Sequence, residues 1–256
     1  MTSFSFDSTD LSTIGKVTKI NYLDTPQRRG NNQIIPFQHG TAFSAKYYDE
    51  RHIVLGLVLQ GDTAQDLEQT MDTLKALVAP RPEKVLAMTM ENGDVRSAYA
   101  SVDATFQTER NSSLIARVVL DFTLSRPFWR GDAHINESVT VNTSPKNLVL
   151  TNTGTVEERN PVITLTGPLQ NTVLTNNGVS MTYTGTIAGG EVVVITTNSW
   201  GEYTATLDGT DNVIGNLSHN GSAAYMVIDV GENTIVITDE TATTGEVKIE
   251  FDPPYL

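Results

Sequence analysis

The sequence has no cysteine among its 256 residues, which excludes disulfide bonds, thiolate metal sites and cysteine nucleophiles. It also has no run approaching the roughly 20 apolar residues that a membrane-spanning helix requires. The first ten residues, MTSFSFDSTD, lack the basic and apolar regions of a secretion signal. We therefore expect a soluble, unexported chain without a membrane anchor, whose hydrophobic fraction of 39% is enough to bury a core.

Cations are scarce in the second half of the chain. Residues 134–256 hold three basic side chains, Lys146, Arg159 and Lys248, against 14 acidic ones, whereas residues 1–133 hold 14 basic and 16 acidic. The two charges, −11 and −2, sum to the −13 of the whole chain. This shift predicts two domains, 1–133 and 134–256. A domain so poor in cations cannot neutralise phosphates, so we expect no nucleic-acid or anionic-membrane binding through it.

Hydrophobic periodicity in the first half predicts strands around one helix. The β-branched run from Ile53 to Leu59 is typical of a strand covered on both faces. Thr63 and Asp66 have the spacing of a capping box, and apolar residues at helical spacing follow them, which predicts a helix over 63–79. The apolar stripe of this helix consists of Leu67, Met71, Leu74, Leu77 and Val78.

A hairpin and a one-sided strand are predicted next. Segments 84–90 and 95–106 flank Asn92-Gly93, a pair that we expect to supply two positive φ angles for a tight turn. Between Leu114 and Leu124 the even positions are all apolar and the odd positions are mixed. We therefore expect the even face of this strand to point into a core.

The sequence pattern of the second half predicts an antiparallel β-sandwich. Residues 134–160 are rich in Thr, Asn, Ser and Pro and predict a connector that holds one or two strands. Beyond Pro161, short β-branched segments recur between glycine and asparagine turns, without a helical pattern. The predicted strands are 162–166, 171–175, 179–184, 191–197, 202–208, 224–230, 233–238 and 245–251.

Motifs for catalysis, metals or cofactors are lacking. The histidines are isolated along the sequence, and no nucleophile-elbow, phosphate-loop or dinucleotide motif is present. Two acidic groupings, at 62–66 and 208–211, lack EF-hand spacing, so we interpret them as caps and turns. The basic pair Arg28-Arg29 is interpreted as a solvated turn in preference to a nucleic-acid contact, and a salt bridge between subunits is the third option. The four histidines are His39, His52, His134 and His219.

Two aromatic residues are the candidate ligand contacts. Trp200 and Tyr203 lie in one segment, with Tyr183 and Tyr225 in neighbouring predicted strands, so they offer a stacking surface for a sugar. Core or edge packing is the alternative interpretation. A lectin-like carbohydrate-binding module is therefore one alternative function, and a glycosidase with two carboxylates in a cleft is another.

The order of these parts resembles the siphophage distal tail protein family. The apolar strand, capped helix, hairpin and a strand ending in Ser125-Arg-Pro-Phe-Trp129 are similar to the N-terminal half of that family. The likeness covers about residues 20–256, without a family signal in residues 1–15 and without an inserted carbohydrate-binding module. Its later motifs are Thr151-Asn-Thr-Gly154, Asn160-Pro-Val-Ile-Thr-Leu165, Gly231-Glu-Asn-Thr-Ile-Val-Ile237, Gly245-Glu-Val-Lys-Ile-Glu-Phe251 and Pro254-Tyr-Leu256.

The resemblance implies a mainly β virion structural protein of the bacteriophage tail tip, or baseplate. Residues 1–133 would be a ring-forming belt domain, sandwich- or barrel-like, with one α-helix and a β-hairpin. Residues 134–256 would be a galectin-like antiparallel β-sandwich. The family joins the tail tube to the tail-tip hub protein as a hexameric ring, which can also carry receptor-binding proteins. The genome passes through the ring without specific binding.

The same resemblance implies no enzyme activity, no cofactor, no metal and no catalytic residue. It implies assembly in the host cytoplasm and residence at the tip of the viral tail. A closed ring uses head-to-tail contacts, for which exposed strand edges in the first half offer backbone groups. The acidic second half would repel its own copies, which disfavours stacking through the wrong face.

Overall fold

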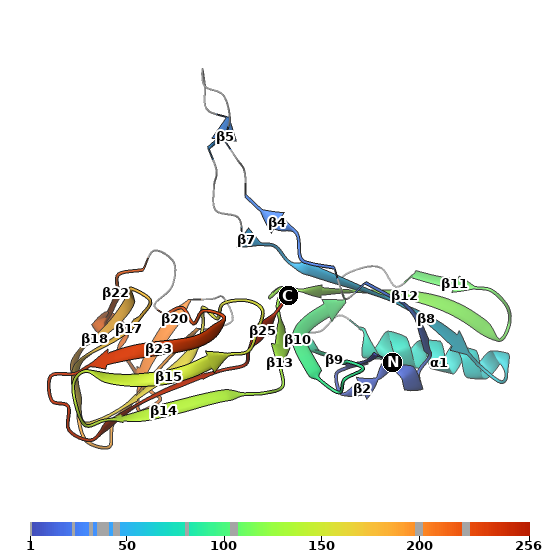
Figure 1. The fold of residues 1–256 in the computed structure, drawn as a ribbon. Helices are drawn as coiled ribbons and strands as arrows, with labels where there is room; N and C mark the ends of the chain where they lie inside the picture. Colours follow the sequence, from blue (N-terminus) through green and yellow to red (C-terminus); the bar gives the residue numbers. More distant parts are fainter. Residues whose placement is uncertain are drawn as a thin grey trace. The chain divides into compact units, whose positions relative to one another are not determined.

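The computed structural model describes residues 2–21, 24–30, 33–34, 41–42, 47–79, 82–102, 107–197, 202–221 and 226–256. Contacts divide the chain into two compact units, Met1–Arg130 with Leu256 and Gly131–Tyr255, here called the N-terminal unit and the C-terminal unit. The described residues form antiparallel strands in both units and contain one α-helix (Figure 1). The predicted mainly β fold is confirmed.

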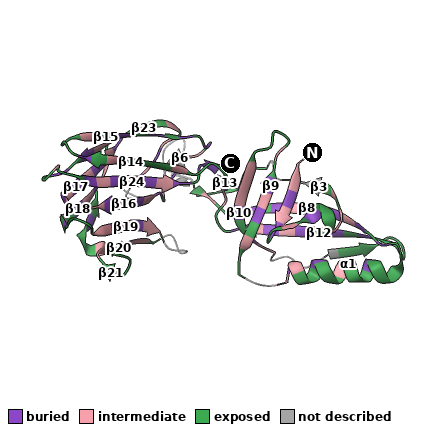
Figure 2. Cartoon of the chain, turned by 90° about the horizontal axis from the view of Figure 1, so that it is seen from below, coloured by how far each residue is buried: buried purple, intermediate pink, exposed green. Residues whose placement is uncertain are grey.

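A curled antiparallel sheet forms the N-terminal unit. Its strands follow the order β2-β1-β9-β10-β12-β8-β3, and β11 pairs with β12 beyond the end of β10. Figure 2 shows β9 and β10 running across the direction of β8 and β12, so the sheet has two wings. The elements are β1 (Ser3–Phe6), β2 (Thr9–Asp10), the 3₁₀ turn η1 (Leu11–Thr13), β3 (Lys16–Ile20), β8 (Arg51–Gln60), α1 (Ala64–Leu77), β9 (Lys84–Thr89), β10 (Val95–Val102), β11 (Gln107–Arg110) and β12 (Ile115–Leu124).

The longest ladder of the N-terminal unit joins β8 to β12. It runs from Ile115 opposite Gln60 to Leu124 opposite Arg51, so the alternate apolar residues of both strands point to the same face. This face packs against β1, where the ring centroids of Phe6 and Phe122 lie 5.0 Å apart. The buried hydrophobic residues of β8 and β12 are Ile53, Leu55, Leu57, Leu59, Ala116, Val118, Leu120, Phe122 and Leu124.

The alternation expected for residues 114–124 is thus confirmed within the strand, although Leu114 precedes it and is 40% exposed. The expectation that β8 is covered on both faces is wrong. Val54 and Val58 point to the second face and are only half-buried. A run of β-branched residues indicates strand propensity as well as burial, and the sequence alone does not separate the two effects.

Helix α1 begins as its sequence predicts. The Thr63 hydroxyl accepts a hydrogen bond from Asp66 N–H at 3.1 Å, and the Asp66 carboxylate accepts one from Thr63 N–H at 2.9 Å. Leu67 and Leu74 of the predicted stripe are fully buried, and the helix contacts β8. This capping box satisfies backbone donors that the first turn leaves without intrahelical partners. None of the described helices is long and apolar enough to cross a membrane.

The β9–β10 hairpin forms where it is predicted, but its turn differs. Only Gly93 has a positive φ, at 91°, and Asn92 has none. Gly93 N–H donates to the Met90 carbonyl at 3.0 Å, and Met90 N–H donates to the Asp94 carbonyl at 2.8 Å. The loop is therefore a type I turn closed by a left-handed glycine. The Asn92 side chain favours this form because it bonds to Asp94, its amide donating to the carboxylate at 2.6 Å.

Two antiparallel sheets form the C-terminal unit. One has the order β14-β24-β16-β19-β20-β21 and the other the order β15-β23-β17-β18-β22. Their inner faces share one hydrophobic core, as a β-sandwich requires. The elements are β13 (Trp129–Gly131), β14 (Ile135–Val141), β15 (Lys146–Asn152), β16 (Val162–Thr166), β17 (Leu169–Asn176), β18 (Val179–Ile187), β19 (Val192–Thr197), β20 (Tyr203–Leu207), β21 (Asp211–Asn212), η2 (Ile214–Asn216), β22 (Leu217–His219), β23 (Gly231–Thr238), β24 (Gly245–Phe251) and β25 (Pro254–Tyr255), of which β13 spans the division between the units.

One predicted strand of this unit, 224–230, is wrong over the part that the structure describes. Residues 226–230 contribute only an isolated bridge between Ile228 and Glu158. Buried asparagine side chains take the neighbouring backbone groups instead: Asn176 donates to the Val227 carbonyl at 2.7 Å. Side-chain amides here replace a strand ladder, which apolar periodicity does not reveal.

A buried carboxylate joins β17 to the loop that follows β23 in the C-terminal unit. Asp239, only 6% exposed, accepts hydrogen bonds at 2.7–2.9 Å from Gln170 N–H, the hydroxyl and N–H of Thr241, the Thr172 hydroxyl and Ala242 N–H. Burial acts to raise the pKa of Asp239, but these donors outweigh it and hold the pKa below its usual value. The ionised form is therefore favoured by the folded state.

The capping box gives a first prediction. Thr63→Ala removes one of its two hydrogen bonds, so the free energy of unfolding of the N-terminal unit should fall by about 1 kcal/mol. Urea unfolding followed by far-ultraviolet circular dichroism measures the change. The control is Thr70→Ala, since the Thr70 hydroxyl bonds back to the Asp66 carbonyl inside the helix and its loss should be nearly neutral. Equal losses in both variants would contradict the role of the cap.

Asp239 gives a second prediction, on the C-terminal unit. Because the folded-state pKa is depressed, its stabilisation is fully present above the unfolded-state pKa of about 3.9 and is lost as pH falls through the lower folded pKa. Asp239→Asn should lower the free energy of unfolding by about 1–3 kcal/mol at neutral pH and flatten its decline in acid. Thermal unfolding between pH 7 and pH 3 tests this, with exposed Asp211→Asn as control. An unchanged acid slope in Asp239→Asn would contradict the assignment.

Candidate functional site

A two-stranded arm extends the chain between β3 and β8. Its described parts are two short ladders, β4 (Arg28–Arg29) with β7 (Tyr47–Tyr48), and β5 (Gln33–Ile34) with β6 (Thr41–Ala42). Figure 1 shows the arm leaving the sheet at the start of β8. The predicted turn at Arg28-Arg29 is instead a strand, with Tyr47 beside it 53% exposed.

Arg28 fixes the first ladder of the arm. Its guanidinium lies 5.2 Å from the ring centroid of Tyr48 and donates to the Tyr48 hydroxyl at 3.1 Å. The Tyr48 ring in turn meets Phe128 edge to face, with centroids 5.6 Å apart. These contacts connect the arm to the segment that follows β12, so both chain segments are held at the same end of the sheet.

Arg51 anchors the base of the arm. It is the first residue of β8, is only 2% exposed, and donates to the Asp24 carbonyl at 2.7 Å and the Pro127 carbonyl at 3.5 Å. Its guanidinium also lies 5.8 Å from the ring centroid of buried Trp129. Burial lowers the pKa of Arg51, and the nearby Asp24 opposes that shift. One cation thus ties the arm, β8 and the segment after β12 together.

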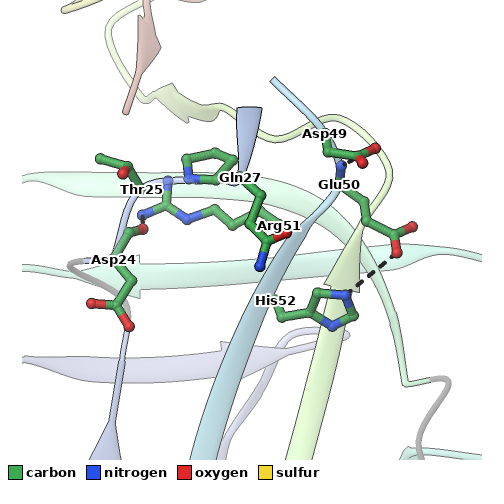
Figure 3. Close-up of a pocket in the computed structure, with 8 residues that line it drawn as sticks. Asp24, Thr25, Gln27, Asp49, Glu50, Arg51 and His52 are labelled. Atoms are coloured by element: carbon green, nitrogen blue, oxygen red, sulfur yellow. Dashed lines mark hydrogen bonds and ion pairs between the residues drawn. The ribbon is translucent and has the colours of Figure 1, made fainter. Parts of the chain in front are cut away.

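A pocket of about 350 Å³ lies beside this anchor (Figure 3). It is lined by residues 24–27 and 49–52, which bring three carboxylates, one histidine and the Arg51 side chain together. His52 faces Glu50 across 3.4 Å and Asp121 across 3.2 Å, and about half of its side chain is exposed. In the described part of the chain, no three histidine or acidic side chains are placed to hold a metal ion.

His134 forms a second charged cluster, in the C-terminal unit. Its Nδ1 lies 2.8 Å from Asp252 and its Nε2 lies 3.6 Å from Glu250, which raises the pKa of His134, mainly through the bond to Asp252. The Lys248 ammonium, 2.7 Å from Glu250, lowers the pKa of Glu250. His134 and Asp252 are 118 positions apart, so no sequence spacing marks this pair.

The aromatic residues predicted to contact a carbohydrate are not brought together in what the structure describes. Trp200 and Tyr225 lie outside the described residues. Tyr183 is buried in the sandwich core. Tyr203 is half-buried against that core and donates its hydroxyl to the Arg159 carbonyl at 2.6 Å. A sugar contact by Trp200 and Tyr203 stays a prediction.

The weak acidic motifs have the cap and turn roles that were predicted. Asp66 belongs to the capping box of α1. Asp208 and Gly209 both have positive φ, at 48° and 75°, and the Asp208 carboxylate accepts a hydrogen bond from Val192 N–H at 2.9 Å. His39 lies outside the described residues. The arm and the Arg51 anchor at its base are therefore the candidate functional features that the structure defines best.

One protein family matches the sequence directly. The profile of the phage tail protein RIFT-related domain matches residues 8–124, a segment that contains the arm, α1 and the sheet from β2 to β12. No curated protein matches the chain. The family match lies wholly inside the N-terminal unit.

Solved structures extend the likeness to both units. The chain is similar to the SPP1 Dit (gp 19.1) protein, described as a paradigm of the hub adsorption apparatus in Gram-positive infecting phages, with 13% identity, a TM-score of 0.73 and 100% of each chain covered. Chains of the phage P2 baseplate in its activated conformation, with Ca and with Sr, match at 10% identity, 98% coverage of each chain and a TM-score of 0.46, which is too low to carry an argument. The resemblance expected from the sequence is confirmed at this level: residues 8–124 match the phage tail protein RIFT-related domain, and the whole chain has the fold of the SPP1 Dit protein.

Proposed function

We propose that this structural protein of the siphophage tail assembles into a hexameric ring that joins the tail tube to the tail-tip hub or baseplate. Residues 1–133 form the ring as its belt domain, and residues 134–256 form a galectin-like domain on its outside. The centre of the ring is an open channel for the genome. The single observation that carries the proposal is the fold, which covers all of the Dit chain described as a hub adsorption protein.

The architecture of the N-terminal unit supports self-assembly. The curled sheet ends in the short strand β2 on one side and in β3 on the other, so β3 has an edge without a sheet partner in the described part of the chain. The two ladders of the arm likewise offer backbone groups for pairing. With a net charge of −2, residues 1–133 can approach their own copies without strong repulsion.

The partners follow from the position of the ring. The tail-tube protein contacts one face, the hub protein contacts the other, and a receptor-binding protein attaches to the outer domains. The ring forms in the host cytoplasm and remains at the tail tip of the virion. Because the proposed role of the protein is structural, it requires no catalytic residue and no cofactor.

Ring formation is directly testable. Mass photometry over a wide concentration range, paired with negative-stain images, should give hexamers with a central hole at high concentration. The same images with an added tail-tube end should give rings capping the tube. A chain that stays monomeric in both settings would contradict the proposal.

The channel proposal predicts weak attraction for DNA. Passage of duplex DNA is slowed by a wall that binds phosphates, so the assembled ring should not retard duplex DNA in a gel-shift assay at physiological salt. Retention of DNA by the unmodified ring would contradict an inert channel.

A further inference from the structure

Three asparagines of the chain are each followed by glycine: Asn92, Asn177 and Asn220. In this dipeptide the backbone nitrogen of the glycine can attack the side-chain amide of the asparagine, because glycine has no Cβ to obstruct the approach. All three asparagines are exposed, so access of water does not distinguish them. They differ in the hydrogen bonds that hold their side chains.

The Asn92 side chain is held by bonds within its own turn, between β9 and β10. Its amide nitrogen donates to the Asp94 carboxylate at 2.6 Å, and its oxygen accepts from Asp94 N–H at 3.1 Å. Gly93 N–H donates to the Met90 carbonyl at 3.0 Å. Each of these bonds joins residues no more than three positions apart, so they break together when the turn opens. An exposed hairpin tip of this kind has a low free energy of opening.

The other two side chains are bonded to distant parts of the C-terminal unit. The Asn177 amide donates to the Asp229 carboxylate at 2.6 Å, across 52 positions of sequence. Asn220 accepts from Ser180 N–H at 2.7 Å and donates to the Gly178 carbonyl at 3.1 Å, so it bridges to the β17–β18 hairpin. Releasing either side chain requires this hairpin to separate from another segment, which costs more free energy than opening one turn.

We propose that Asn92 is a site of spontaneous deamidation in the folded protein, and that the fold protects Asn177 and Asn220 from the same reaction. Asparagine is among the thermolabile residues of proteins. The substrate is the side-chain amide of the chain itself, and the co-reactant is water. This inference is independent of the proposed ring.

The reaction takes place in two steps. The Gly93 nitrogen gives its proton to hydroxide and bonds to Cγ of Asn92, while the bond from Cγ to Nδ2 breaks. The amide nitrogen takes a proton from water and leaves as ammonia, so residues 92 and 93 are joined in a cyclic imide. Water then adds to one of the two imide carbonyls and opens the ring to aspartate or isoaspartate. No group is oxidised or reduced.

The product changes the turn that made it. The amide that donates to Asp94 is replaced by a carboxylate, so two negative charges face each other where a 2.6 Å hydrogen bond stood. Isoaspartate also adds a main-chain atom between residues 92 and 93, which displaces Gly93 N–H from the Met90 carbonyl. Each reacted copy therefore gains one negative charge and has a looser β9–β10 hairpin tip.

Peptide mapping of the aged full chain tests the choice of site. The folded protein is incubated in mildly alkaline buffer made with heavy-oxygen water, and its peptides are followed by mass spectrometry. Asn92 should take up the labelled oxygen at least about tenfold faster than Asn177 and Asn220. In concentrated urea the three asparagines should react at similar rates, because the fold no longer separates them.

Two variants test the cause. Asp229→Ala removes the bond that holds Asn177, so the rate at Asn177 should rise several-fold while the rate at Asn92 stays unchanged. Asn92→Gln keeps an amide at the turn but lengthens the side chain by one methylene, which disfavours closure of the imide. The acidic species that accumulates in the aged protein on isoelectric focusing should therefore be lost from this variant.

The engineered product Asn92→Asp supplies the reference for the reacted chain. It should focus with the acidic species of the aged protein, and its Gly93 amide should exchange hydrogen faster than in the unmodified chain. A rate at Asn92 no faster than at Asn177 or Asn220 in the folded protein would overturn the proposal. An acidic species that accumulates equally in Asn92→Gln would overturn it as well.

Discussion

The pairing of β8 with β12 is the interaction on which the N-terminal unit depends. Ten residues of each strand meet in one register, from Gln60 opposite Ile115 to Arg51 opposite Leu124. A slip of one residue would turn every buried leucine of one strand to solvent. The same register places Ile115, Arg117 and Val119 side by side on the outer face. One alignment therefore determines both the buried face and the outer face of these strands.

Local signals in the sequence were sufficient to predict many of the helices, strands and turns of the fold. The capping box of α1 was predictable because Thr63 and Asp66 bond only to each other's backbone, without help from distant residues. The alternation in β12 was predictable because one covered face selects every second residue. The sandwich strands were predictable from glycine and asparagine turns, as at Asn177-Gly178, where both residues have positive φ.

Side-chain partners, both neighbouring and distant, explain what the sequence could not show. Asn92-Gly93 and Asn177-Gly178 are the same dipeptide, but the neighbouring Asp94 holds the Asn92 side chain and changes the first turn. The Arg51 anchor joins residues from the arm, β8 and the segment after β12, which only the folded chain brings together. The contacts that hold the arm in place depend in this way on residues far apart in the sequence, so the sequence alone could not predict them.

The ends of β8 and β12 have a further consequence. Arg51 begins β8 opposite Leu124, which ends β12, so the arm and the chain that leads to the second unit depart from the same end of the sheet. The family match stops at Leu124, within a few residues of that exit. Insertions or substitutions beyond Leu124 therefore leave the register of the β8–β12 ladder unaltered, because none of its paired residues lies downstream of that position.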